Sequence, residues 1–386
     1  MRRFNLKVLV ILSLGHLVTD IYQGALPATL PFLKEELSLS YTMTGVILMV
    51  SGFTSSVLQP LFGFYSDKKE KAALLPIGLM CAGIGYSLLS IPANYFFVLF
   101  LVAISGLGIA AYHPEGYKTA HFFTGERSVT GMAVFSVGGN LGLALGPVMA
   151  ISTIQYLGFS WLPVAVIPSL FCTAIVLSLK RTIAIPRLEH ATKQESVGKT
   201  PAGAYVSLFM VVAIVIMRSW TQMGLVSYIP FYYINYLKGD PFFAGKLVFV
   251  FLASGAAATL LGAPLADRWG HRFFIRLSMF LSTVTLPLIF IPSVAKSYLL
   301  FVVLGLQGMF LISTFSVTVV MAQKLLPHRL GVASGLMVGF AIGTGGIGVA
   351  LLGVVADNFG VPVALKSIMI LPIIGFILSL FLKYKE

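Results

Sequence analysis

The chain has 386 residues, of which 58% are hydrophobic and 10% are charged, and its mean hydropathy is +0.94. A soluble globular protein cannot bury so large an apolar fraction, so the composition excludes one and indicates a membrane protein. The formal net charge of +13 would also suit a nucleic-acid partner, and the positions of the basic residues have to decide between these explanations.

Twelve apolar segments follow one another along the chain, each of the length that a membrane-spanning helix needs. Continuous apolar runs favour helices over the short alternating strands of a barrel. The first 20 residues resemble a signal peptide, but His16 and Asp20 interrupt their apolar stretch, so we interpret them as a retained first helix. The predicted spans are residues 6–30, 41–66, 72–91, 94–118, 128–155, 159–179, 204–237, 241–266, 272–292, 296–324, 329–355 and 361–383.

Most of the 26 lysines and arginines fall in segments that lie on one side of the membrane. If the N-terminus is inside, this side is the cytoplasm, and both termini are cytoplasmic. The basic charge is then explained by membrane topology, and no nucleic-acid partner is expected. Cys81 and Cys172 lie in apolar runs, so no disulfide framework is expected either.

The polar stretch of residues 180–203 divides the twelve spans into two groups of six, and similar sequences recur in the two groups. GFYSDKKEK, with Asp67, follows the second span, and APLADRWGHR, with Asp267, follows the eighth. We therefore predict an all-α membrane protein of two pseudo-symmetric six-helix halves, with a substrate site between them. The predicted boundaries are 1–180 for the N-terminal half, 181–203 for a cytoplasmic linker and 204–386 for the C-terminal half.

The first span carries a polar stripe on one helical face, formed by Ser13, His16, Asp20 and Gln23. An ionisable residue at membrane depth costs roughly 2.5–3.5 kcal/mol on insertion scales, which makes Asp20 a functional candidate. Because a low-dielectric environment disfavours the charged form of a carboxyl group, we expect Asp20 to exchange a proton, with His16 beside it. The alternative is a structural hydrogen bond between the two.

The fourth span ends in AYHPEGYKTAHFF, residues 111–123, where polar residues follow an uncharged run. At about 1.5 Å per residue, His113 lies roughly 27 Å along this helix, toward the cytoplasm. We expect His113 and Glu115 to contribute to proton exchange or substrate entry, and Lys118 to extend to the cytoplasmic surface. The alternative is a structural kink at Pro114 with a local ion pair.

The seventh span carries a comparable stripe, which consists of Arg218, Gln222, Leu225, Tyr232 and Tyr236. An arginine always keeps its charge and can hold an anionic group through two hydrogen bonds. We expect Arg218 to contact an anionic group of the substrate. The alternative is that Arg218 neutralises Asp20 as a structural ion pair.

Several of these stretches resemble a known family. The loops at Asp67 and Asp267 resemble the signature of the major facilitator superfamily, and GLALGP resembles the Gly-Pro motif of its drug and proton antiporters. GHLVTDIYQ, AYHPEGYKTA, FSVGGNLGLALGP and GVASGLMVGFAIGTGGIGVALLGVVAD resemble the fosmidomycin resistance group of exporters, over nearly the whole chain. The loops depart from the superfamily pattern at Glu70, Ala263 and His271, and the arginine motif of the fourth helix is missing.

The resemblance implies roles for the residues in these motifs. Gating roles fall on Asp67, Asp267, Arg268, Gly146 and Pro147. For the glycines at 138, 139, 142 and 146, which recur near every fourth residue, close helix packing is the default explanation, and a role in antiport rests on the resemblance alone. The two polar stripes and the VGGN run supply the expected substrate-binding residues, which are Arg218, Gln23, Gln222, Tyr232 and Asn140.

No ATP-binding loop is present, since GDPFFAGKL has the wrong spacing, so transport should use an ion gradient. We predict a secondary transporter in the inner membrane, a proton-coupled antiporter that exports drugs or small molecules, fosmidomycin-like anions included. An importer or uniporter of a small metabolite or anion would use the same architecture. We expect a monomer whose partners are substrate, protons and lipid, with no enzymatic activity, no cofactor and no metal site.

Overall fold

The computed structural model describes residues 4–39, 41–68, 72–91, 94–179, 181–183, 202–239 and 241–384. All regular structure in these residues is helical. By length and composition, eleven described helices can span a membrane, and the predicted third span forms a shorter apolar helix, Leu74–Ser90. The prediction of an all-α membrane protein is therefore confirmed. Most of the predicted linker, residues 184–201, lies outside the described part of the chain.

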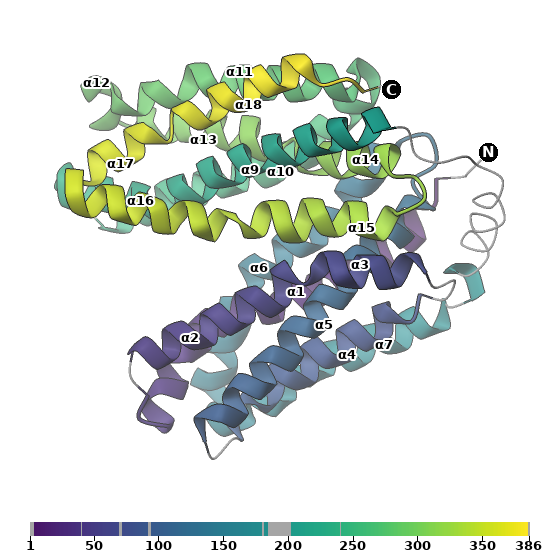
Figure 1. The fold of residues 1–386 in the computed structure, drawn as a ribbon. Helices are drawn as coiled ribbons and strands as arrows, with labels where there is room; N and C mark the ends of the chain where they lie inside the picture. The colour runs from purple at the N-terminus through teal and green to yellow at the C-terminus, as the bar shows by residue number, and fades with distance from the viewer. Residues whose placement is uncertain are drawn as a thin grey trace. The chain divides into compact units, whose positions relative to one another are not determined.

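The chain forms two compact units, and the first contains residues 1–199 and 327–340. In Figure 1, α4, α5 and α7 of this unit run side by side. The helices of the first unit are α1 (Leu6–Glu36), α2 (Tyr41–Gly52), a π-helical segment (Phe53–Val57), α3 (Gln59–Asp67), α4 (Leu74–Ser87) with a 3-10 turn (Leu88–Ser90), α5 (Tyr95–His121), α6 (Ser128–Leu157), a 3-10 segment (Phe159–Val166), α7 (Ile167–Ser178) and α15 (Leu330–Ser334).

The second unit contains residues 200–326 and 341–386. Between the two stretches, the chain contributes α15 to the first unit, and the π-helical segment Gly335–Ala341 follows it. The helices of the second unit are α9 (Ala202–Phe231) with a π-helical segment (Tyr232–Tyr236), α10 (Pro241–Trp269), α11 (His271–Thr285) with a 3-10 segment (Leu286–Phe290), α12 (Pro292–Ala295), α13 (Leu299–Ile312), α14 (Phe315–Leu325), α16 (Gly345–Phe359), α17 (Val361–Ser367) and α18 (Ile370–Phe381).

Helices α1 and α6 pack closely because α6 presents glycines where it meets the polar stripe of α1. A Cβ atom on Gly139 would lie 2.5 Å from Nε2 of His16 and 2.6 Å from Oδ2 of Asp20. A Cβ on Gly146 would lie 2.5 Å from the backbone nitrogen of Ala25. Small residues let membrane helices approach to backbone contact. The glycine run of α6 therefore sets the position of the face of α1 that carries His16 and Asp20.

Gln59 begins α3, and one residue separates it from the π-helical segment Phe53–Val57. Pro60, the next residue, has no N–H group to donate to the preceding turn, so regular helical bonding is interrupted here. Short π-helical segments within helices often lie at functional sites, because they change the direction of the side chains around them. In this chain, the interruption lies beside a buried polar cluster.

Candidate functional site

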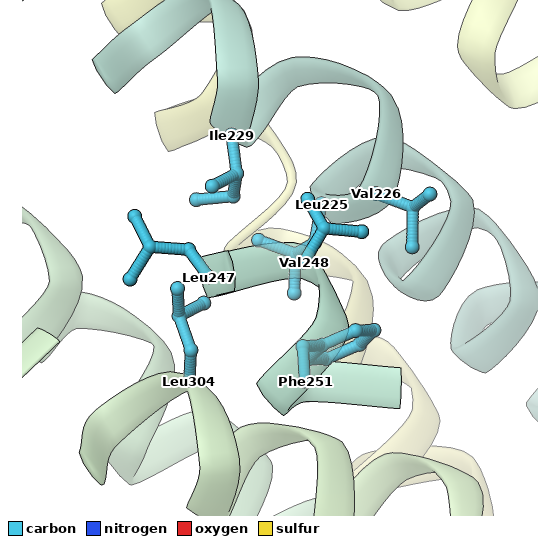
Figure 2. Close-up of a pocket in the computed structure, with 7 residues that line it drawn as sticks. All are labelled: Leu225, Val226, Ile229, Leu247, Val248, Phe251 and Leu304. Carbon is cyan, nitrogen blue, oxygen red and sulfur yellow. The ribbon is translucent and has the colours of Figure 1, made fainter. Parts of the chain in front are cut away.

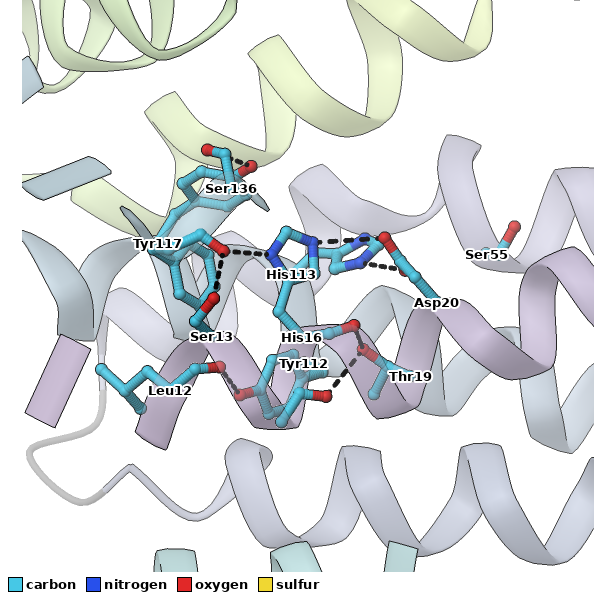
Figure 3. Close-up of polar contacts among 12 residues, drawn as sticks. Leu12, Ser13, His16, Thr19, Asp20, Ser55, Tyr112, His113, Tyr117 and Ser136 are labelled. Atoms are coloured by element: carbon cyan, nitrogen blue, oxygen red, sulfur yellow. Dashed lines mark hydrogen bonds and ion pairs between the residues drawn. The ribbon is translucent and has the colours of Figure 1, made fainter. Parts of the chain in front are cut away.

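The side chains of His16, Asp20 and His113 form a buried cluster between α1 and α5. Oδ1 of Asp20 lies 2.8 Å from Nε2 of His113, and Oδ2 of Asp20 lies 3.3 Å from Nε2 of His16. The dashed contacts in Figure 3 join Asp20 to both imidazole rings. The exposed fractions of His16, Asp20 and His113 are 3%, 5% and 4%. The cluster therefore unites a residue pair expected on α1 with one of the polar residues that end α5.

The far side of each imidazole ring also has a polar partner. Nδ1 of His16 lies 3.1 Å from the backbone carbonyl oxygen of Phe135 in α6. Nδ1 of His113 lies 3.0 Å from Nε2 of Gln59, and the same Gln59 nitrogen donates to the carbonyl oxygen of Ser55 at 2.8 Å. Hydrogen bonds at both ring nitrogens fix the orientation of an imidazole. The result is a continuous chain of polar contacts from α3 through α5 and α1 to α6.

Aromatic rings enclose the His16 side of the cluster. The imidazole of His16 stacks on Phe135, with centroids 4.6 Å apart, and meets Tyr117 edge-on at 5.7 Å. The hydroxyl group of Tyr112 donates to the carbonyl oxygen of Leu12 at 2.7 Å, so its polar end is satisfied outside the cluster. Apolar surroundings lower the local dielectric and strengthen the interactions between the polar groups inside them.

The cluster also has the donor types of a metal site. One ligand atom from each of His16, Asp20 and His113 lies within 4.8 Å of the other two, a convergence that the spacing of these residues in the sequence did not predict. Imidazole and carboxylate groups are ligands of zinc and of other transition metals. The 2.8 Å contact between Asp20 and His113 is, however, a direct hydrogen-bond distance. The geometry in this structure is that of a hydrogen-bonded cluster.

Two other polar residues of α5 lie outside the cluster. Glu115 is completely buried, and its Oε1 atom is 3.5 Å from the hydroxyl group of Thr119. The expectation that Lys118 extends to the cytoplasmic surface is wrong, because this side chain is only 6% exposed. Its Nζ atom donates to the carbonyl oxygen of Ser66 at 2.7 Å and lies 3.5 Å from Oδ1 of Asp67. A buried ammonium group with a carboxylate in reach pairs with it rather than extending to water.

Asp67, at the C-terminal end of α3, also binds the first turn of α15. Its two carboxylate oxygens accept hydrogen bonds from the backbone N–H groups of Gly331 (2.8 Å) and Val332 (3.0 Å). These N–H groups have no acceptor within their own helix, so an acidic side chain at this position acts as a cap. A Cβ atom on Gly63 would lie 2.8 Å from the backbone nitrogen of Val332, which explains why glycine occupies this position in α3.

In the second unit, Arg218 lies on α9 and is 2% exposed. Its Nη1 atom donates to the hydroxyl group of Thr314 at 3.2 Å, and its guanidinium carbon lies 5.7 Å from the centroid of the Phe315 ring. A guanidinium group donates hydrogen bonds in one plane and can hold an anion through two of them.

The remaining expected site residues are distributed over both units. Gln23 lines a small pocket with Tyr22 and Ser51 of the first unit. Asn140, Gly146 and Pro147 lie in α6, and Gln222 lies in α9. Tyr232 stacks on Tyr236, with ring centroids 5.4 Å apart. In α10, Asp267 is partly buried and Arg268 is exposed.

A further pocket lies among α9, α10 and α13 and is shown in Figure 2. All of its seven lining residues are apolar: Leu225, Val226, Ile229, Leu247, Val248, Phe251 and Leu304. A ligand site normally adds a few placed polar groups to its apolar walls. This pocket offers none from its side chains, so it is a weaker candidate for substrate than the surroundings of Arg218.

Sequence reasoning missed one residue and one pairing in these contacts. Gln59 is the only amide side chain in the predicted span 41–66, and that isolated polarity was the available signal for its role. An aspartate after the second span is expected to meet a helix N-terminus or a basic residue, but nothing in the sequence identified Lys118 as that residue, because the pair joins separate helices.

Comparison with known proteins agrees with this architecture. The model of the Major Facilitator Superfamily matches residues 12–245 and 211–386. An uncharacterized MFS-type transporter, YfnC of Bacillus subtilis, is 32% identical over 376 residues, which cover 96% of this chain and 91% of the relative. The fosmidomycin resistance protein of Escherichia coli is 31% identical over 383 residues, which cover 98% of this chain and 93% of the relative.

Solved structures of transporters share the fold. FucP, a Major Facilitator Superfamily transporter, in its outward conformation has a TM-score of 0.74 at 16% identity, and the match covers 98% of this chain and 99% of that one. The human organic anion transporter MFSD10 has a TM-score of 0.75 at 17% identity, covering 96% and 98%. The predicted resemblance is confirmed: the chain belongs to the major facilitator superfamily, as a multi-pass membrane transporter of small molecules rather than an enzyme.

Proposed function

We propose that the protein is a proton-coupled antiporter that exports small molecules, anionic ones of the fosmidomycin type included. The observation that carries the proposal is the buried cluster of His16, Asp20 and His113, whose polar atoms meet within a membrane-spanning helix pair. Ionisable residues at membrane depth are costly and are retained where ions or protons pass. Imidazole and carboxylate groups exchange protons in the physiological range more readily than other side chains in these spans.

Two observations support the substrate class. Arg218 supplies a permanent positive charge inside the second unit, and its fork of donors suits a phosphonate or carboxylate. One relative carries the name fosmidomycin resistance protein, which fits export of an antibiotic from the cell. In this proposal Gln23, Gln222, Tyr232 and Asn140 complete the substrate contacts, and Glu115 is a further proton-coupling candidate.

The proposed cycle follows alternating access in the inner membrane, with both termini in the cytoplasm and the protein acting as a monomer. Substrate enters from the cytoplasm, protonation of the cluster from outside promotes release, and proton loss to the cytoplasm resets the carrier. Asp67 stabilises one state by capping α15, and Asp267, Arg268, Gly146 and Pro147 contribute to gating.

The proposal is tested in proteoliposomes with an imposed pH gradient. Fosmidomycin and unrelated drugs are added in turn, and proton movement and substrate flux are recorded for the parent protein and Asp20→Asn. Asp357→Asn, the same change at an exposed position of α16, is the matched control. We expect proton flux that depends on substrate, is lost in Asp20→Asn and persists in the control.

Two results would contradict the proposal. Substrate flux that is unchanged by the pH gradient and by Asp20→Asn would indicate a uniporter. Substrate and protons moving in the same direction would indicate a proton-coupled importer of a metabolite or anion. Flux measured in right-side-out and in inverted vesicles distinguishes import from export.

A further inference from the structure

We infer that the His16–Asp20–His113 cluster carries a single proton beyond its two imidazole N–H groups, and that Gln59 is the positioning residue that keeps a second one out. The inference rests on the proposed proton-coupled function and deepens it, because it specifies how many protons this site moves. It follows from which atoms of the cluster can only donate and which can only accept a hydrogen bond.

The orientation of the Gln59 amide group is fixed by Ser55. The terminal Gln59 atom that lies 2.8 Å from the Ser55 carbonyl oxygen must be the NH₂ group, because a carbonyl oxygen only accepts. The same NH₂ group lies 3.0 Å from Nδ1 of His113, so that ring nitrogen carries a lone pair. The hydrogen of neutral His113 is therefore on Nε2, and it is donated to Oδ1 of Asp20 at 2.8 Å.

The tautomer of His16 is fixed by a backbone carbonyl group. Nδ1 of His16 lies 3.1 Å from the carbonyl oxygen of Phe135 and must carry a hydrogen to make this contact. Nε2 of His16 then faces Oδ2 of Asp20 at 3.3 Å. Without a further proton, two lone pairs would face each other there. One proton therefore lies on this edge, on His16 or on Asp20, and the cluster is neutral overall in either case.

Both neighbouring protonation states are disfavoured. Removing the proton would leave a net negative charge in a buried site, which is costly without a compensating partner. Adding a second proton would put a hydrogen on Nδ1 of His113, where it would meet the NH₂ group of Gln59, donor against donor. Turning the amide group would bring Oε1 to His113 but would remove the donor from the Ser55 carbonyl group.

The Oε1 atom of Gln59 supports this reading. It is buried, and it has no hydrogen-bond partner among the residues that the structure describes. The amide group thus places its NH₂ group toward both Ser55 and His113 while its own acceptor is left unsatisfied. Buried polar groups are nearly always paired, so this arrangement needs a reason, and the tautomer of His113 provides one.

The remaining titratable groups around the cluster leave the proton count unchanged. Tyr112 and Tyr117 of α5 contact the ring of His16, and both are neutral phenols near neutral pH. From α6 the neighbours are Phe135 and Gly139, and from α3 the neighbour is Gln59, all of them uncharged. The charges of Lys118 and Asp67 lie farther along α5 and α3 and pair with each other.

The first test measures the ring protonation in the parent protein. Full-length protein labelled with ¹⁵N-histidine is reconstituted in lipid vesicles, and the protonation of each ring nitrogen is recorded by solid-state NMR near neutral pH. The His113 signals are assigned by their loss in His113→Gln. We expect a hydrogen on Nε2 and none on Nδ1 of His113, and a hydrogen on Nδ1 of His16. A hydrogen on Nδ1 of His113 in the parent protein would overturn the inference.

The second test changes the group that faces His113. In Gln59→Glu an oxygen replaces the NH₂ group, so we expect Nδ1 of His113 to gain a hydrogen and the proton-to-substrate ratio in proteoliposomes to rise from one toward two. Gln59→Met, which has similar length, removes the opposing donor without supplying an acceptor, so as the control it should raise the ratio less than Gln59→Glu. An unchanged His113 tautomer in Gln59→Glu would contradict the role of Gln59.

The two readouts separate this inference from the proposed function. If the NMR pattern is as expected but no substrate moves protons, the assignment of the cluster stands and the antiport proposal falls. If protons are coupled to substrate but Nδ1 of His113 carries a hydrogen in the parent protein, the antiport proposal stands and the single-proton inference falls.

Discussion

Oδ1 of Asp20 in α1 lies 2.8 Å from Nε2 of His113 in α5, although the two residues are 93 positions apart in the chain. The contact joins the polar stripe of the first helix to the polar end of an otherwise apolar helix. It places a carboxylate between two imidazole rings in a buried environment. The predictions that follow test what this contact and its neighbours do for stability and transport.

Replacing His113 with leucine should destabilise the protein, because it leaves the Asp20 carboxylate without one of its two partners. Leaving a buried charged group without one of its hydrogen-bond partners typically costs about 1–3 kcal/mol or more. The measurement is the midpoint of thermal unfolding in detergent, with His121→Leu at the end of α5 as the control. The double variant Asp20→Leu with His113→Leu should recover part of the loss, since no buried charge remains. A double variant that is no more stable than His113→Leu would contradict this account.

Replacing Gly139 with alanine should disrupt the contact between α1 and α6. The added methyl group would lie 2.5 Å from Nε2 of His16 and 2.6 Å from Oδ2 of Asp20, closer than real contacts allow. Overpacking of this kind typically costs about 1–3 kcal/mol, so we expect a lower unfolding midpoint. Gly52→Ala in α2 is the matched control, because a Cβ there meets nothing within 4 Å. Equal unfolding midpoints for the two variants would show that α6 shifts to accommodate the added methyl group without loss of stability, which would contradict this account.

Replacing Asp67 with alanine should loosen the first turn of α15. The substitution removes the acceptors of the Gly331 and Val332 N–H groups. Loss of a cap costs about 0.5–2 kcal/mol, which corresponds to roughly 2-fold to 30-fold faster local exchange. Hydrogen–deuterium exchange of the peptide containing these residues measures the effect. The control is Asp267→Ala, at the corresponding position of the repeated loop sequence, and it should not alter the exchange of this peptide. If Asp67→Ala does not alter it either, the capping role is contradicted.

Replacing Arg218 with lysine should weaken the binding of anionic substrates. The charge is kept, but the paired donors of the guanidinium group are lost. A hydrogen bond to a charged group contributes about 1.5–3 kcal/mol, so we expect KM for an anionic substrate to rise roughly tenfold or more. The control is transport by Arg276→Lys. Arg276 donates hydrogen bonds to the carbonyl oxygens of Ser379 and Leu380. An equal effect on neutral and anionic substrates would indicate that Arg218 has a structural role.

Much of the fold could be predicted because each membrane-spanning helix is encoded locally. A run of about 20 apolar residues has to form its own backbone hydrogen bonds in lipid, so its length and composition are sufficient to predict a helix. The third span is the partial exception, since Leu74–Ser90 is shorter than the others. Lys118 shows the limit of the same reasoning: its position near the end of α5 suggested exposure, but its partner comes from α3, which local sequence does not reveal.

The sequence by itself determined the class of the protein, the helices and the polar face of α1, because helical periodicity places Ser13, His16, Asp20 and Gln23 on one side whatever surrounds them. Only the tertiary structure decided that His113 meets this face and that Gln59 binds His113. Periodicity fixes which residues share a face but not which helix packs against it, and the packing depends on the close approach that the glycines of α6 permit. The proton count of the cluster depends on these contacts, because each donor and acceptor is identified by a partner from another helix or turn.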